Sequence, residues 1–95
     1  MKLLKDILYK VAIQSVKGRT DVHVNALVFD SRKVQSNDVF FAIKGGVSDG
    51  HHYIDKAVSL GASVVICEHF PEALSEEVTY VQVDNSSEAL AFCNN

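Results

Sequence analysis

Two short polar segments carry side chains that could bind an anionic nucleotide. The first begins Asp30-Ser31-Arg32, and the second spans residues 44–50, with glycines at 45, 46 and 50. Serine hydroxyls and the arginine fork donate hydrogen bonds to phosphate. Glycine lets backbone amides approach a ligand closely, and the start of a following helix adds partial positive charge. These residue types favour holding a phosphate-bearing ligand over making or breaking bonds.

A plain turn is an equally simple interpretation of each segment. A glycine pair after a strand is often only a turn, and Asp-Ser-Arg can form an Asx-type turn with a solvated arginine. Neither the phosphate loop G-x-x-x-x-G-K-[ST] nor the dinucleotide fingerprint G-x-G-x-x-G is present. Considered without any relative, the residues leave both nucleotide binding and a plain turn open.

Other combinations of reactive side chains are weaker. His51 and His52 are adjacent, and neighbouring helical residues point about 100° apart, so the pair does not chelate one metal easily. We expect these histidines to be solvated or to cap a helix. The run Cys67-Glu68-His69 lacks a second pair at zinc spacing. We therefore predict no catalytic residue, no metal site and no bound cofactor in this chain.

Composition predicts one small soluble globular domain. The chain has 95 residues, of which 47% are hydrophobic and 22% charged. The formal net charge of −3 and the absence of a basic stripe exclude a general nucleic-acid binder. No apolar run approaches the ~20 residues that span a bilayer, and residues 1–6 lack a signal-peptide pattern, so we expect no membrane partner and a cytoplasmic location. Cys67 and Cys93 are expected to be buried free thiols.

Hydrophobic periodicity predicts an α/β domain. We expect helices over residues 3–11, 49–61 and 85–93, strands over 22–29, 38–43, 63–67 and 78–83, a loop over 15–21 and a turn or short helix over 71–77. Asp49 and Asn85 are expected to cap helices, and Gly61 to end one. The predicted fold is a small three-layer domain with a mixed, mostly covered sheet containing a right-handed βαβ unit.

The inward faces of the two later helices are also predicted. Ile54, Ala57 and Val58 form the inward stripe of one, and the inward residues of the other are Ala89, Leu90, Phe92 and Cys93. Both polar segments leave the ends of apolar strands, where open α/β sheets bind their ligands. The chain stops in or just after a helix, as expected of a piece cut at a domain boundary.

Several runs together resemble the N-terminal domain of Mur ligases. They are Asp30-Ser31-Arg32-Lys33, Asn37-Asp38-Val39-Phe40-Phe41-Ala42-Ile43-Lys44-Gly45, Asp49-Gly50-His51-His52-Tyr53-Ile54, Ala57-Val58-Ser59-Leu60-Gly61-Ala62 and Val81-Gln82-Val83-Asp84-Asn85-Ser86. The resemblance covers residues 22–93 and is strongest to the ligases that add the third residue of the peptidoglycan stem peptide (MurE). Residues 1–95 are accordingly expected to form the family's UDP-binding domain.

The resemblance implies a function for the two polar segments. In this family the first domain binds the UDP end of a UDP-MurNAc-peptide, while a central domain binds ATP and magnesium and a third helps recruit the amino acid. These further domains, absent from this chain, would be its partners. At matching positions, the resemblance implies ligand contacts from Phe29, Ser31 and the backbone of the second segment. Electrostatics adds the positively charged side chains of Arg32 and Lys44. The predicted UDP-sugar site comprises Phe29, Ser31, Arg32, Lys44, Gly45, Gly46, Val47 and Ser48.

Two alternatives to this function stay open. One is the equivalent domain of the ligases that add D-alanyl-D-alanine (MurF), which is built similarly. The other is a binding module that has no role with nucleotides and no catalytic role. The resemblance does not decide which diamino acid, diaminopimelate or lysine, the whole enzyme would use. Within the first segment, Asp30 is expected to fix the loop rather than to touch the ligand.

Overall fold

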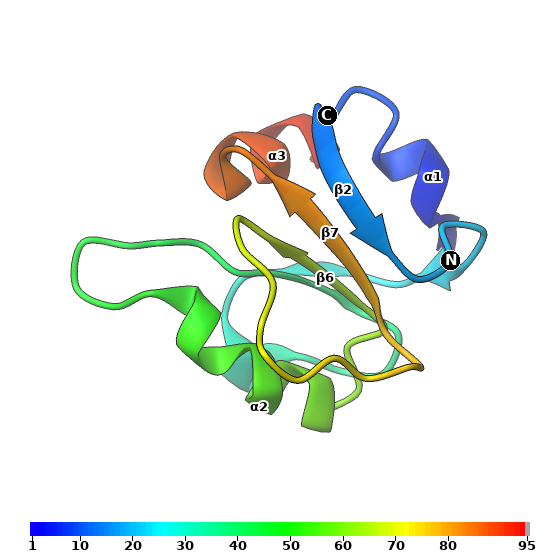
Figure 1. Ribbon diagram of the computed structural model, residues 1–95. Coiled ribbons are helices and arrows are strands. Elements are labelled where there is room, and N and C mark those ends of the chain that lie inside the picture. Colours follow the sequence, from blue (N-terminus) through cyan, green and yellow to red (C-terminus); the bar gives the residue numbers. More distant parts are fainter. Residues whose placement is uncertain (95) are drawn as a thin grey trace.

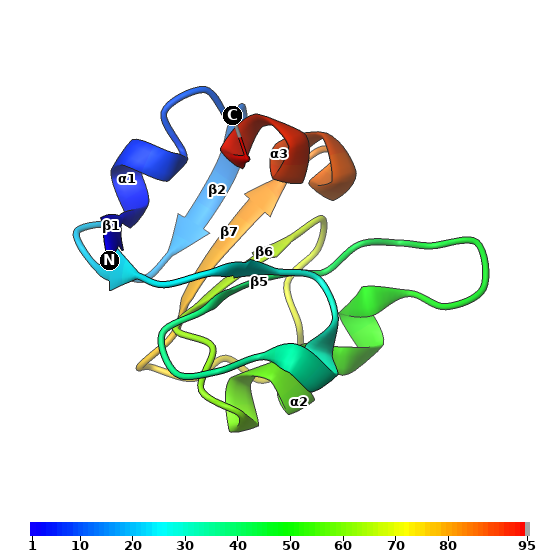
Figure 2. The same cartoon turned by 180° about the vertical axis from the view of Figure 1, so that it is seen from behind.

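The computed structural model describes residues 1–94, which form a mixed five-stranded sheet, a small two-stranded sheet and helices on both faces (Figures 1 and 2). The strands are β1 (Lys2–Leu3), β2 (Ile13–Lys17), β3 (His23–Val24), β4 (Leu27–Val28), β5 (Val39–Phe41), β6 (Val64–Cys67) and β7 (Thr79–Val83). The helices are α1 (Leu4–Ile7), α2 (Ile54–Ser59) and α3 (Ser86–Cys93), with short 3₁₀ helices η1 (Ser31–Lys33) and η2 (Gly50–Tyr53).

The large sheet has the strand order β2-β7-β6-β5-β4. Strands β4 to β7 are parallel neighbours, and β2 pairs antiparallel with β7 at one edge. The unit β5-α2-β6 joins two parallel strands through a helix, as predicted. The α/β class and the mixed, covered sheet are thus confirmed.

Two hydrophobic clusters cover the two faces of the sheet, because successive strand residues point to opposite sides. On one side, Phe41 and Ile66 pack with Leu4 of α1 and Ala89 of α3. On the other side, the strand residues adjacent in sequence to Phe41 and Ile66 pack with Ile54 of α2. Figure 1 shows the same division, with α1 and α3 on one side of the strands and α2 on the other. The central strands are therefore buried on both faces, as their continuous apolar sequence predicts.

The expected strand over residues 22–29 is wrong in detail, since it is two short strands in different sheets. β3 pairs with β1, and β4 pairs with β5. Between them, the Asn25 amide donates to the Asn37 carbonyl at 2.8 Å, and the Ala26 amide donates to the Asp38 carboxylate at 3.1 Å. Asn37 has a left-handed φ of 68°. These bonds to a turn replace a regular ladder and redirect the chain from one sheet to the other.

The expected loop over residues 15–21 is wrong at its start, because residues 13–17 form the edge strand β2. Ile13 pairs with Val83 and Lys17 with Tyr80. Four of the five residues of β2 are exposed, so their side chains give no strong strand signal. Backbone pairing to β7 makes the strand. Gly18 follows at φ 113°, where a Cβ would lie 2.9 Å from the Thr79 Cα, so the close approach requires glycine.

The first helix is shorter than expected and ends at Ile7. Leu4 and Leu8 reach the core, as the spacing predicts, and the chain then turns into β2 because pairing with β7 outweighs the helical tendency of residues 8–11. The helix expected over 49–61 begins as η2, is capped by Asp49 as predicted, and is followed by Gly61 at φ 113°.

The last helix agrees with the predicted cap but not with one inward residue. Asn85 accepts the Glu88 amide at 3.0 Å, and Ala89 is buried while Leu90 and Cys93 pack against the core. Phe92 is 42% exposed, which corrects its predicted inward position. At 100° per residue it lies on the flank of a helix whose buried side is set by Ala89 and Cys93.

The cysteines are free, as expected. Cys67 is fully buried, and burial raises its pKa to about 11. Cys93 is half-buried, with a pKa raised for the same reason. Segment 71–77 forms bends and turns, in line with the prediction. Within residues 1–94, no helix combines the length and apolar character that crossing a bilayer requires.

Candidate functional site

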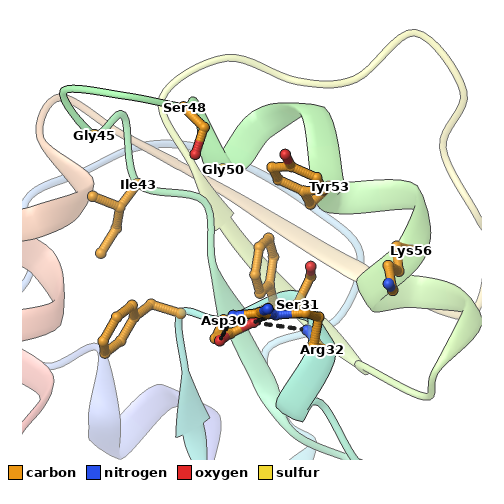
Figure 3. Close-up of a pocket in the computed structure, with 11 residues that line it drawn as sticks. Asp30, Ser31, Arg32, Ile43, Gly45, Ser48, Gly50, Tyr53 and Lys56 are labelled. Atoms are coloured by element: carbon orange, nitrogen blue, oxygen red, sulfur yellow. Dashed lines mark hydrogen bonds and ion pairs between the residues drawn. The ribbon is translucent and has the colours of Figure 1, made fainter.

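The loops that follow β4 and β5 border a cavity of about 530 Å³. We call residues 30–37 the first loop and residues 44–49 the second loop. Because β4 and β5 are parallel neighbours, both loops leave the same edge of the sheet. Figure 3 shows side chains from both loops and from η2 and α2 around this space. The cavity is lined by Phe29, Asp30, Ser31, Arg32, Phe40, Ile43, Gly45, Ser48, Gly50, Tyr53 and Lys56.

The first loop is organised by Asp30. Its carboxylate accepts hydrogen bonds from the Arg32 amide at 3.0 Å and from Arg32 Nε and Nη2 at 3.0 and 2.9 Å (Figure 3). The guanidinium bonds, followed by the amide bond, lower the pKa of Asp30 to about 2. The same pair raises the pKa of Arg32. Asp30 therefore fixes the turn, as expected, and two of the arginine's donor groups are already engaged.

Ser31 lies at the start of η1, with 7% of the residue exposed. Figure 3 shows its hydroxyl pointing into the space between the first loop and the element that carries Tyr53. The capping bonds of Asp30 fix the backbone on either side, so the Cβ from which the hydroxyl projects is held in one place. A backbone that is ordered before binding loses little entropy when a ligand binds, and the hydroxyl can hydrogen-bond a polar group.

The second loop closes at its base and leaves its tip free. The Gly50 amide donates to the Ile43 carbonyl at 2.8 Å, and the Gly45 amide donates to the Ser48 carbonyl at 2.9 Å. A Cβ on Gly50 would lie 2.7 Å from the Ile43 nitrogen, so the base requires glycine. Among residues 1–94, none accepts a hydrogen bond from the amides at 46, 47 or 48. These donors are available to a ligand.

The structure brings five of the eight predicted site residues to one cavity. Those five are Phe29, Ser31, Arg32, Gly45 and Ser48. Lys44, Gly46 and Val47 belong to the second loop but do not line the cavity, and Val47 is fully exposed. The loop projects away from the sheet, as the green excursion in Figures 1 and 2 shows.

Sequence reasoning missed two polar residues of the lining, Tyr53 and Lys56. They come from η2 and α2, three positions apart, which places them on one side of a helical segment. The sequence signal that could have indicated them is their three-residue spacing directly after the glycine-rich segment. Because Asp30 balances the charge of Arg32, Lys56 supplies the cavity's uncompensated positive charge.

The lining contains no set of residues suited to ATP or a metal ion. Over residues 1–94, no group of three or more histidine, cysteine or acidic side chains could hold a metal. The sequence also lacks a phosphate loop. ATP and magnesium, which the family resemblance implies for the whole enzyme, therefore do not fit these residues, and the cavity supports no reaction step that involves them.

A family model and relatives in other bacteria match most of this chain. Residues 23–93 match the model described as "Mur ligase family, catalytic domain". The chain is 49% identical, over 92% of its length, to the UDP-N-acetylmuramoyl-L-alanyl-D-glutamate–2,6-diaminopimelate ligase of Cytophaga hutchinsonii, of which it covers 18%. It is 40% identical to the enzyme of the same name from Bacteroides fragilis, again over 92% of this chain and 18% of the relative.

Solved structures share the fold. A MurF crystal structure from Acinetobacter baumannii superposes with a TM-score of 0.75, covering 96% of this chain and 19% of that one at 24% identity. A MurF ligase from Thermotoga maritima, solved with ADP, gives a TM-score of 0.65 at 34% identity over 74% of this chain and 16% of that one. The chain spans about a fifth of the length of these relatives. On the family match and the sequence identity, this chain belongs to the Mur ligase family.

Proposed function

We propose that this chain is the N-terminal domain of a Mur ligase and binds the UDP end of a UDP-MurNAc-dipeptide in the cavity between the two loops. The parent enzyme uses ATP and magnesium to add the third stem-peptide residue during peptidoglycan synthesis in the cytoplasm. One observation carries this proposal. A serine hydroxyl on an ordered turn, a loop with free amides and a lysine border one cavity at the carboxyl ends of parallel strands.

The roles of the residues follow from their chemistry. The Ser31 hydroxyl lines the cavity, and the free amides at 46–48 lie in the loop that borders it; both supply hydrogen bonds to the uracil edge or the pyrophosphate. Phe29 is 65% exposed at the cavity and offers an apolar face to the base. Arg32, Lys44 and Lys56 make the surroundings favourable for phosphate, with Arg32 contributing charge and its remaining donors.

Relatives favour diaminopimelate as the added amino acid. The enzymes from Cytophaga hutchinsonii and Bacteroides fragilis are both named as 2,6-diaminopimelate ligases. We propose that the parent enzyme adds diaminopimelate. A ligation assay on the full-length enzyme, offering diaminopimelate, L-lysine and D-alanyl-D-alanine separately, tests it, and turnover of another amino acid alone would contradict it.

The D-alanyl-D-alanine-adding ligases remain the second candidate, since a solved MurF ligase is 34% identical over 74% of the chain. The same assay separates the two. Turnover of D-alanyl-D-alanine with a UDP-MurNAc-tripeptide would establish this alternative. A binding module without nucleotide affinity is the third candidate, and it fails if UDP binds.

Matched variants test the binding site in this chain. We expect calorimetric titration to give a millimolar affinity for UDP, equivalent to about 4 kcal/mol. Ser31→Ala and Arg32→Ala should each weaken it. Ser87→Ala, on the exposed side of α3, and Arg19→Ala are the controls. Arg19 forms the same two-bond pair with Asp21 that Arg32 forms with Asp30, but away from the cavity. An equal loss of UDP affinity in Arg32→Ala and Arg19→Ala would contradict the proposed site.

A further inference from the structure

His51 follows Gly50, at the base of the second loop, and only 5% of its side chain is exposed, which corrects the solvated or capping position expected from the sequence. Its Nδ1 lies 2.6 Å from the Asp49 carboxylate, and its Nε2 lies 2.9 Å from the Glu68 amide nitrogen. Its ring stacks on the His69 ring at 4.1 Å between centroids, with 12° between the planes. The imidazole thus touches the end of the second loop and the end of β6.

The hydrogen-bond partners of the His51 ring define which of its two nitrogens carries the hydrogen. A backbone amide only donates, so Nε2 must accept from Glu68. In the neutral ring the hydrogen then lies on Nδ1 and is donated to Asp49. Asp49 also accepts the His51 backbone amide at 2.9 Å, and this bond is the main cause of the lowered pKa of Asp49.

The hydrogen bonds continue from Glu68 to α3. The Glu68 carboxylate accepts the Ser86 amide at 2.9 Å and the Ser86 hydroxyl at 3.2 Å. The Glu68 carbonyl accepts the Gln82 side-chain amide at 3.1 Å. One chain of polar contacts therefore joins the second loop to the end of β6, to β7 and to the start of α3.

The second loop has few other restraints. Its base is closed by the Gly50–Ile43 and Gly45–Ser48 bonds, and its tip is exposed with free amides. A loop that projects from the sheet needs a fixed end if its tip amides are to occupy one position. His51 supplies that end through a contact 17 residues away in the chain.

We propose that His51 is a positioning residue for nucleotide binding: bonded between Asp49 and the Glu68 amide, its imidazole holds the second loop against the carboxyl end of β6, so that the amides at 46–48 are preorganised for the diphosphate or base. This inference rests on the proposed function for its ligand, but the ligand-free behaviour of the loop depends on the structure alone. His51 itself touches no ligand.

The test uses three variants of this chain. His51→Phe keeps a flat ring but removes both hydrogen bonds. His51→Gln keeps an acceptor that reaches the Glu68 amide. His52→Phe is the matched control, because His52 is adjacent and exposed. For each, ¹⁵N relaxation of the amides at 44–49 is measured without ligand, and UDP affinity is measured by titration.

We expect His51→Phe to make the loop amides more mobile and to weaken UDP binding about tenfold, which corresponds to about one hydrogen bond. His51→Gln should restore most of both properties, and His52→Phe should match wild type. In wild type, imidazole ¹⁵N shifts should show the hydrogen on Nδ1. If the His51 ring only filled space, His51→Gln would restore neither the order of the loop amides nor the UDP affinity.

Two results would overturn the proposal. One is an imidazole carrying its hydrogen on Nε2, and the other is unchanged loop mobility and UDP affinity in folded His51→Phe. If His51→Phe does not fold, His51→Gln decides by the same readouts, and affinity lost with an intact Glu68 contact would overturn the proposal. A wild-type chain that fails to bind UDP contradicts the proposed function instead, while loop relaxation still decides whether His51 positions the loop.

Discussion

The two loops that border the cavity are held in different ways. The first loop is organised by its own side chains, since Asp30 bonds Arg32 two residues away and Asp38 accepts the Gln35 amide three residues away. The second loop is closed near its base by the Gly45–Ser48 and Gly50–Ile43 backbone bonds, and its end is fixed by His51 through the distant Glu68 amide. The locally organised first loop presents a serine hydroxyl, while the second loop, fastened at its base, leaves the amides at 46–48 free. In the proposed site, the two loops therefore have different tasks.

The largest expected effect comes from Asp38, which closes the first loop. Its buried carboxylate accepts the Ala26 amide at 3.1 Å and the Gln35 amide at 2.8 Å. Asp38→Ala leaves both donors without their partner and should lower the free energy of unfolding by about 3 kcal/mol. Urea denaturation measures this loss. Asp55→Ala, an exposed aspartate on α2, is the control, and equal effects would show that the first loop does not depend on Asp38.

Substitutions at Gly50 and Gly46 compare the base of the second loop with its tip. A Cβ at Gly50 would lie 2.7 Å from the Ile43 nitrogen, whereas a Cβ at Gly46 would meet nothing within 4 Å. Gly50→Ala should therefore cost about 2 kcal/mol of stability, and Gly46→Ala less than about 0.5 kcal/mol. Thermal or urea unfolding of the two variants measures both losses of stability. Similar losses in both would mean that the tip is as constrained as the base.

Acid should loosen the first loop at an unusually low pH. The pKa of Asp30 is about 2 in the folded chain, below its ordinary value of 3.8, chiefly because the Arg32 side chain bonds the carboxylate. Since the folded-state pKa is depressed, this contribution to stability is complete above the unfolded pKa and is lost as pH falls through about 2. Carboxyl ¹³C shifts measure the titration. Arg32→Gln should raise the midpoint, and an unchanged midpoint would contradict the pairing.

Val47 should give the smallest effect. Its side chain is fully exposed at the tip of the second loop, and the proposed ligand contact is through the backbone. Val47→Ala should change stability by less than about 0.5 kcal/mol and UDP affinity by less than about twofold. A larger loss of affinity with unchanged stability would show that the side chain, not the backbone, meets the ligand.

The contrast between local bonds and bonds to distant segments also explains which features the sequence predicts. The turn at Asp30 and the caps at Asp49 and Asn85 depend on bonds within two or three residues, and residue types at that spacing predict them. The covered strands follow from continuous apolar runs. Strand β2 and the bond from His51 to Glu68 depend on pairing with distant segments, so no local pattern predicts them. Convergence of the loops on one cavity required only that their strands be parallel neighbours.

Amide NMR during a UDP titration tests most directly whether the two loops form one nucleotide site. We predict saturable shifts concentrated at residues 29–32 and 44–50, with the first and second loops saturating together at one affinity. Shifts confined to other surfaces would contradict this prediction. So would the absence of shifts at about 10 mM UDP, well above the expected millimolar dissociation constant, both in this chain and in a full-length ligase that contains it.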